Sequence, residues 1–133
     1  MELCKGGTIS EAKDGNPIDE ITCAKYIKQI AMALLYCHER NIIHSDIKPA
    51  NIMLDEDKKN IKLIDFGVSV RHNPNQLKNL AGSVRYMAPE VFEYNYDFKA
   101  DIWSLGITLV FLLSGKHPWG SPKSTLDEMK RLI

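Results

Sequence analysis

Apolar residues recur at every third or fourth position in the segment after Asn16-Pro17, which is the spacing of one face of an α-helix. The apolar positions are Ile21, Ala24, Ile27, Ala31, Leu34 and Cys37. Asp19 stands just before them, and its side chain can accept a hydrogen bond from a free backbone N–H at the start of a helix. The pattern therefore predicts a helix over 19–40 that turns these apolar positions toward the core.

Two shorter apolar runs lie further along the chain, at 52–54 and 61–64, on either side of a polar turn at 55–60. Their length and the turn between them predict a small β-hairpin. The stretch 41–43 is a short apolar bridge before the hairpin, whereas 71–80 is polar and we expect it to be irregular.

The longest apolar run of the chain lies at 102–113. It is too short to span a bilayer, so it predicts a buried helix that ends at Ser114-Gly115. A last amphipathic helix is predicted over 122–133, and its apolar face comprises Leu126, Met129 and either Leu132 or Ile133. The predicted fold class is mainly α with a small β-hairpin insert.

Composition limits the class of protein further. The 133 residues suit one domain, and 17 basic residues balance 17 acidic ones, so we expect no nucleic-acid partner and no anionic membrane surface. The three cysteines, Cys4, Cys23 and Cys37, are scattered and lack metal-ligand spacing. They fit free thiols in a reducing compartment, so we expect a cytoplasmic protein, with the nucleus as the alternative.

Candidate chemistry lies around the predicted hairpin. His44-Ser45-Asp46-Ile47-Lys48-Pro49-Ala50-Asn51 precedes it and Asp65-Phe66-Gly67 follows it, so Asp46, Asn51 and Asp65 should meet at one end of the hairpin. A carboxylate, a lysine, an amide and a second carboxylate suit phosphoryl transfer from a magnesium-bound nucleotide. In that reaction the protein mainly positions groups and neutralises charge.

These motifs resemble those of eukaryotic protein kinases, and Lys48-Pro49 is typical of the serine/threonine type. The resemblance covers the chain in the family's order: hinge at 1–8, catalytic loop at 44–51, activation segment at 65–90 and central helix at 101–113. It implies the C-terminal lobe of a two-lobed α+β kinase fold. The sequence 112–119 is similar to that of the calcium/calmodulin-dependent group.

The resemblance implies a role for each catalytic residue. Asp46 would be the base that orients the substrate hydroxyl, and Lys48 would hold the transferring phosphate. Asn51 and Asp65 would bind Mg²⁺, and Ser83 would contact both Asp46 and Lys48. The plainer alternatives are a loop-capping aspartate at 46, a solvated lysine at 48 and a turn-forming aspartate at 65.

The resemblance also implies an ATP pocket. Backbone groups of Glu2 and Cys4 would bind adenine, Met53 would lie beneath the base, and Ile64 would help to close the pocket. Met53 could equally be plain core. Asp101 would accept hydrogen bonds from catalytic-loop amides. The implied cofactors are ATP and Mg²⁺, and the implied partner is a protein substrate.

Ser45 stands where the family has an arginine that binds a phosphate on the activation segment. The stretch 71–82 contains no Ser, Thr or Tyr, so the residue that would be phosphorylated and the arginine that would bind its phosphate are both missing. We therefore expect activity without phosphorylation between 71 and 82, and the sequence alone predicts that Ser45→Arg changes activity little.

The 133 residues begin at the hinge and contain no glycine-rich loop, no strand lysine with its helix glutamate and none of the last helices of the lobe. One hypothesis is a serine/threonine protein kinase whose catalytic half is seen here. The alternative is a non-catalytic kinase-like interaction module or an inactive gene fragment. A small-molecule phosphotransferase fits less well, because the segment that ends at Glu90 and the motif at Asp101 are typical of protein kinases. We expect the isolated chain to need an N-terminal lobe or a stabilising partner.

Overall fold

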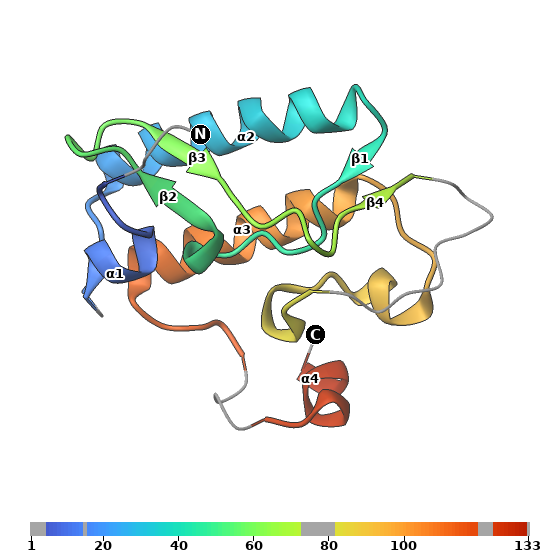
Figure 1. Ribbon diagram of the computed structural model, residues 1–133. Helices are drawn as coiled ribbons and strands as arrows, with labels where there is room; N and C mark the ends of the chain where they lie inside the picture. The colour runs from blue at the N-terminus through green and yellow to red at the C-terminus, as the bar shows by residue number, and fades with distance from the viewer. Residues whose placement is uncertain (1–4, 15, 73–81, 120–123, 133) are drawn as a thin grey trace.

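The computed structural model describes residues 5–14, 16–72, 82–119 and 124–132. Its helices are α1 (Ile9–Lys13), α2 (Glu20–His38), α3 (Lys99–Ser114) and α4 (Leu126–Leu132), with short 3₁₀ helices η1 (Pro49–Asn51), η2 (Val84–Tyr86) and η3 (Pro89–Glu93). The strands are β1 (Ile42–Ile43), β2 (Ile52–Leu54), β3 (Ile61–Leu63) and β4 (Val70–Arg71). α2 and α3 pack against each other and the β2–β3 hairpin lies beside α2, whereas α4 lies apart from this pair and contacts η2 (Figure 1).

The predicted helix over 19–40 is confirmed as α2. Asp19 caps it, because its Oδ1 accepts a hydrogen bond from the backbone N–H of Thr22 (2.9 Å). The predicted apolar face is wrong in part, since Ile21 is 71% exposed. The buried face comprises Cys23, Tyr26, Ile30, Leu34 and Cys37. Tyr26 joins this face because its hydroxyl donates to the Lys58 carbonyl (2.7 Å), which satisfies the polar end of a buried ring.

The predicted hairpin is confirmed as β2 and β3, which pair antiparallel with Ile52 opposite Leu63 and Leu54 opposite Ile61. A second antiparallel pair joins β1 to β4, where Ile43 lies opposite Val70. The sequence prediction missed this pair, because strands of two residues are too short to show an alternating pattern.

The core has two parts. The larger apolar cluster lies between α2, α3 and the β2–β3 hairpin and includes Ile30, Leu34, Ile52, Leu105 and Leu112. The second lies beneath η2, η3 and the start of α3 and includes Ile43, Met87, Val91, Tyr96 and Ala100. Both clusters anchor the catalytic loop, since Ile47 within the loop belongs to the first and Ile43, directly before it, belongs to the second.

The helix predicted at 102–113 is confirmed and begins earlier, at Lys99. Gly115 ends it with a left-handed backbone (φ 74°), a conformation that glycine adopts without a steric penalty. The last helix is shorter than predicted, and on it Met129 is buried while Leu132 is exposed. Among the described residues, no helix is both long and apolar enough to cross a bilayer.

Candidate active site

The catalytic loop leaves β1 and turns sharply. Ser45 has a left-handed backbone (φ 68°), which is unusual for a residue with a side chain and indicates that surrounding contacts hold it. The fully buried side chain of Ile47 anchors the loop in the larger core cluster. Pro49 then starts η1, a position that suits proline because its missing N–H has no partner there anyway.

Asp46 is the centre of a hydrogen-bonded set. Its Oδ2 lies 2.8 Å from Lys48 Nζ and accepts a hydrogen bond from Asn51 Nδ2 (2.8 Å). Its Oδ1 accepts the backbone N–H of Ser83 (2.8 Å). Lys48 Nζ also donates to Ser83 Oγ (2.6 Å), so Ser83 contacts both Asp46 and Lys48. The structure thus brings together all four residues that the sequence prediction assigned to catalysis.

These contacts fix the charge of Asp46. Burial by itself would raise the pKa of the Asp46 carboxyl group, but hydrogen bonds from Lys48 and Ser83 outweigh burial and hold the pKa below its ordinary value. Asp46 is therefore ionised at neutral pH and can accept a proton or orient a donor.

Asn51 and Asp65 are joined through the backbone. The N–H of Ile64, the residue before Asp65, donates to the Asn51 carbonyl (3.0 Å). Asp65 has a left-handed backbone (φ 60°) and an exposed side chain, and its Oδ1 accepts the N–H of Gly67 (3.2 Å). The β2–β3 hairpin therefore brings Asn51 and Asp65 to the same end, as the sequence predicts.

A magnesium ion fits these two residues. Asn51 turns its amide nitrogen toward Asp46, which leaves its amide oxygen for another partner, and Asp65 has a second carboxylate oxygen outside its turn hydrogen bond. Mg²⁺ takes few protein oxygens and keeps several waters. Asn51 and Asp65 remain the predicted ligands of Mg²⁺.

Asp101, from the first turn of α3, holds the catalytic loop in place. Its side chain is 1% exposed and accepts backbone N–H groups from His44 on Oδ2 (2.9 Å) and from Ser45 on Oδ1 (2.9 Å). This is the contact that the resemblance implies. The sequence prediction missed a third partner, His38 Nε2, which lies 2.8 Å from Oδ2. His38 ends α2, and no local signal connects it with a residue so far along the chain.

His44 links the loop to the start of the activation segment. Its Nε2 lies 3.1 Å from the Ile64 carbonyl, and its Nδ1 accepts the N–H of Asp46 (3.3 Å). Burial lowers the pKa of His44 more than the nearby carboxylates raise it. The ring is therefore neutral, with its proton on Nε2, and it ties Asp46 to the residue before Asp65.

The predicted ATP pocket is only partly described. Met53 is half-buried in β2 and forms an isolated bridge with Thr8, and Ile64 is half-buried beside the catalytic loop. Glu2 and Cys4 lie outside the described residues.

A buried carboxylate that is paired with a lysine and an amide, with a second carboxylate at the same end of a hairpin, is the set of groups that phosphoryl transfer requires. The chain belongs to the protein kinase domain family, which matches residues 1–132. The fold is accordingly that of the C-terminal lobe of a protein kinase.

Several kinases are similar to this chain. Calcium-dependent protein kinase 5 of Plasmodium berghei (strain Anka) is 39% identical, over 99% of this chain and 24% of that protein. Serine/threonine-protein kinase PEPKR2 of Arabidopsis thaliana is 44% identical, over 90% of this chain and 26% of that protein. An Aurora kinase of Patiria pectinifera is 43% identical, over 86% of this chain and 28% of that protein. The chain thus spans about a quarter of the length of these relatives.

Proposed function

We propose that the protein that contains this chain is a serine/threonine protein kinase, which transfers the γ-phosphate of ATP to a hydroxyl group of a protein substrate. The observation that carries this proposal is the set in which Asp46, Lys48, Asn51 and Ser83 are joined by hydrogen bonds of 2.6–2.8 Å. A module without chemistry has no need to hold a lysine against a buried carboxylate.

ATP with Mg²⁺ supplies the phosphoryl group, and the residues of this chain position the acceptor. The substrate hydroxyl donates a hydrogen bond to Asp46, which aims the oxygen and later takes its proton. Lys48 contacts both Asp46 and Ser83, and its positive charge would stabilise negative charge that develops on the transferring group. Asn51 keeps Asp46 from rotating, because it donates to both the carboxylate and the carbonyl of that residue (2.8 Å each).

The test uses the full-length protein that carries this chain. Asp46→Asn keeps the size of the side chain but removes its charge, so we expect phosphate transfer to fall by about 100-fold or more. Asp65→Ala should abolish transfer by removing a metal ligand. Asp57→Asn, at an exposed turn position, is the matched control and should behave as wild type. Wild-type transfer rates in Asp46→Asn would overturn the proposal.

A second experiment concerns the 133-residue chain alone. It contains no glycine-rich loop to cover the phosphates. We therefore expect it to bind magnesium-ATP weakly or not at all and to phosphorylate nothing, and we expect an intact N-terminal lobe to restore both properties. Phosphate transfer by the 133 residues that is lost in Asp46→Asn would contradict this expectation.

For the full-length protein we further propose a cytoplasmic location.

The second candidate function is a non-catalytic interaction module. The observation in its favour is the number of exposed apolar side chains on α2, which include Met32, Leu35 and Tyr36. Intact binding to a partner together with inactivity of the full-length wild type would favour this candidate.

A further inference from the structure

Ser45 is held on two sides of its backbone. Its N–H donates to Asp101 Oδ1 on α3 (2.9 Å). Its carbonyl oxygen lies against Gly82, so closely that a Cβ added to Gly82 would overlap it. Gly82 directly precedes Ser83 and has a positive φ of 105°, which glycine tolerates. The left-handed backbone of Ser45 is therefore the point where the catalytic loop, α3 and the end of the activation segment meet.

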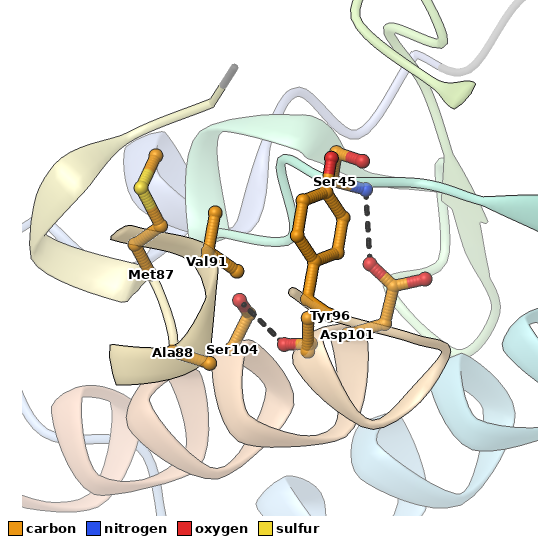
Figure 2. Close-up of a pocket in the computed structure, with 8 residues that line it drawn as sticks. Ser45, Met87, Ala88, Val91, Tyr96, Asp101 and Ser104 are labelled. Atoms are coloured by element: carbon orange, nitrogen blue, oxygen red, sulfur yellow. Dashed lines mark hydrogen bonds between the residues drawn. The ribbon is translucent and has the colours of Figure 1, made fainter. Parts of the chain in front are cut away.

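The side chain of Ser45 has a third neighbour. Figure 2 shows that the ring of Tyr96 stands with its hydroxyl end toward Ser45, and that Asp101 lies beside both. Tyr96 is 6% exposed and packs in the second core cluster. The cavity that these residues line has a volume of only about 10 Å³, so the two side chains are closely enclosed.

Ser45 Oγ is buried, and burial of a hydroxyl without a hydrogen bond is unfavourable. Ser45 Oγ has no hydrogen bond of regular geometry with any residue in the described ranges. The pKa of Tyr96 is raised, mainly by burial and further by the charge of Asp101, while a hydrogen bond with Ser45 lowers it in part.

We propose that Tyr96 is a positioning residue of the catalytic loop, whose hydroxyl pairs with Ser45 Oγ and thereby fixes the backbone that carries Asp46. This inference rests on the proposed kinase function for its effect on catalysis. The residue before Asp46 is then held by a neutral contact with the core, without an arginine and a phosphate. Because Asp46 follows Ser45 directly and its N–H donates to His44, any rotation of the Ser45 backbone moves the catalytic carboxylate.

The position of Tyr96 calls for more than packing. A phenylalanine would fill the same apolar cluster without placing a hydroxyl next to the buried Asp101. Likewise, an alanine at position 45 would remove a buried oxygen. If the two hydroxyls are paired as proposed, their contributions are coupled, so the effect of removing one hydroxyl should shrink when the other is already absent.

The experiment compares the full-length wild type with Tyr96→Phe, Ser45→Ala and the double variant. Tyr94→Phe is the matched control, because Tyr94 lies two residues away and is 48% exposed. One readout is kcat and the KM for ATP in phosphate transfer. The other is amide hydrogen exchange of residues 44–51, which needs no activity.

We expect each single variant to lower kcat by about threefold to tenfold, as for the loss of one hydrogen bond, with the KM for ATP unchanged. Exchange at 44–51 should become faster by a similar factor, and the double variant should lose no more than either single variant. Tyr94→Phe should match wild type in both readouts. Exchange at wild-type rates in both single variants, or losses that multiply in the double variant, would overturn the inference. If the wild type transfers no phosphate but exchange responds as expected, the kinase proposal fails while the positioning role of Tyr96 stands.

Discussion

His117 should make the stability of this fold depend on pH. It follows α3, and both of its ring nitrogens are buried without a hydrogen-bond partner among the described residues. The ring meets the edge of Tyr86 at 4.7 Å between centroids and lies 5.9 Å from Phe111. The pKa of His117 is lowered from 6.5 to about 4, mainly by burial and to a smaller extent by the charge of Arg85.

The lowered pKa of His117 gives the direction and the size of the change in the free energy of unfolding with pH. The folded state binds a proton at His117 less readily than the unfolded state, so the free energy of unfolding falls as the pH drops from about 6.5 toward about 4. The loss would be about 0.2 kcal/mol at pH 7 and about 2 kcal/mol at pH 5, taking the folded pKa as about 4 and the unfolded pKa as 6.5. We halve the change in the free energy of unfolding between pH 7 and pH 5 to about 1 kcal/mol, because the His117 ring is partly exposed and water screens its charge. For a domain of this size, that corresponds to about 4 °C in Tm.

The assay is chemical unfolding at pH 7 and pH 5, followed by the fluorescence of Trp103 and Trp119, whose rings lie 5.8 Å apart near His117. His117→Phe keeps an aromatic ring and removes the titration, so its stability advantage over wild type should grow by about 1 kcal/mol from pH 7 to pH 5. His117→Gln should show the same change with pH without the ring. His44 also has a lowered pKa, but it is present in all three proteins and cancels in the comparison. An advantage of His117→Phe that is equal at the two pH values would refute the reasoning.

Four further predictions concern the loop and the surface. Asp101→Asn should lower the free energy of unfolding by about 3 kcal/mol and reduce activity, because the new amide turns an N–H toward buried donors. Asp57→Asn is the control. Equal denaturation midpoints for Asp101→Asn and wild type would contradict this prediction. Gly82→Ala should abolish phosphate transfer by the full-length protein, since the new Cβ overlaps the Ser45 carbonyl. A wild-type kcat would contradict this prediction and show that the backbone at Gly82 can shift. Ser45→Arg should lower kcat at least as far as Ser45→Ala, because arginine also lacks the hydroxyl that faces Tyr96, and unchanged kcat would restore the expectation from sequence. The 133-residue chain should self-associate in sedimentation velocity, and Leu35→Lys on the exposed face of α2 should reduce this; a wild-type monomer at all concentrations would contradict it.

The sequence predicted the catalytic set well because its members are close along the chain. Asp46, Lys48 and Asn51 lie within one loop, and the hairpin of 52–54 with 61–64 returns the chain to the same end before Asp65. A pattern of local spacing is therefore enough to bring them together. Ser83 required the resemblance, since nothing between 65 and 83 predicts from local spacing where the segment returns.

Helix positions were easier to predict than helix faces. Steps of three and four fit α2, but two neighbouring stripes of that helix satisfy the same spacing. The prediction chose the stripe with Ile21 and did not include Tyr26, whereas the structure buries Tyr26 and exposes Ile21. Which stripe is buried depends on contacts with Lys58 and α3 that come much later in the chain.

The case of Ser45 shows why a departure from a family pattern is hard to interpret from sequence alone. The missing arginine and the lack of Ser, Thr or Tyr in 71–82 both indicate the loss of a phosphate switch, but they do not say what holds the loop instead. That answer depends on Tyr96, which reaches Ser45 only because η3 and α3 fold back beneath the catalytic loop. An ionic contact that forms upon phosphorylation can be switched, whereas the proposed pairing of two hydroxyls next to Asp101 would need no phosphate. The proposed pairing of Ser45 with Tyr96 would set the catalytic loop when the chain folds. Activity without phosphorylation in 71–82 remains a prediction, to be tested on the full-length protein.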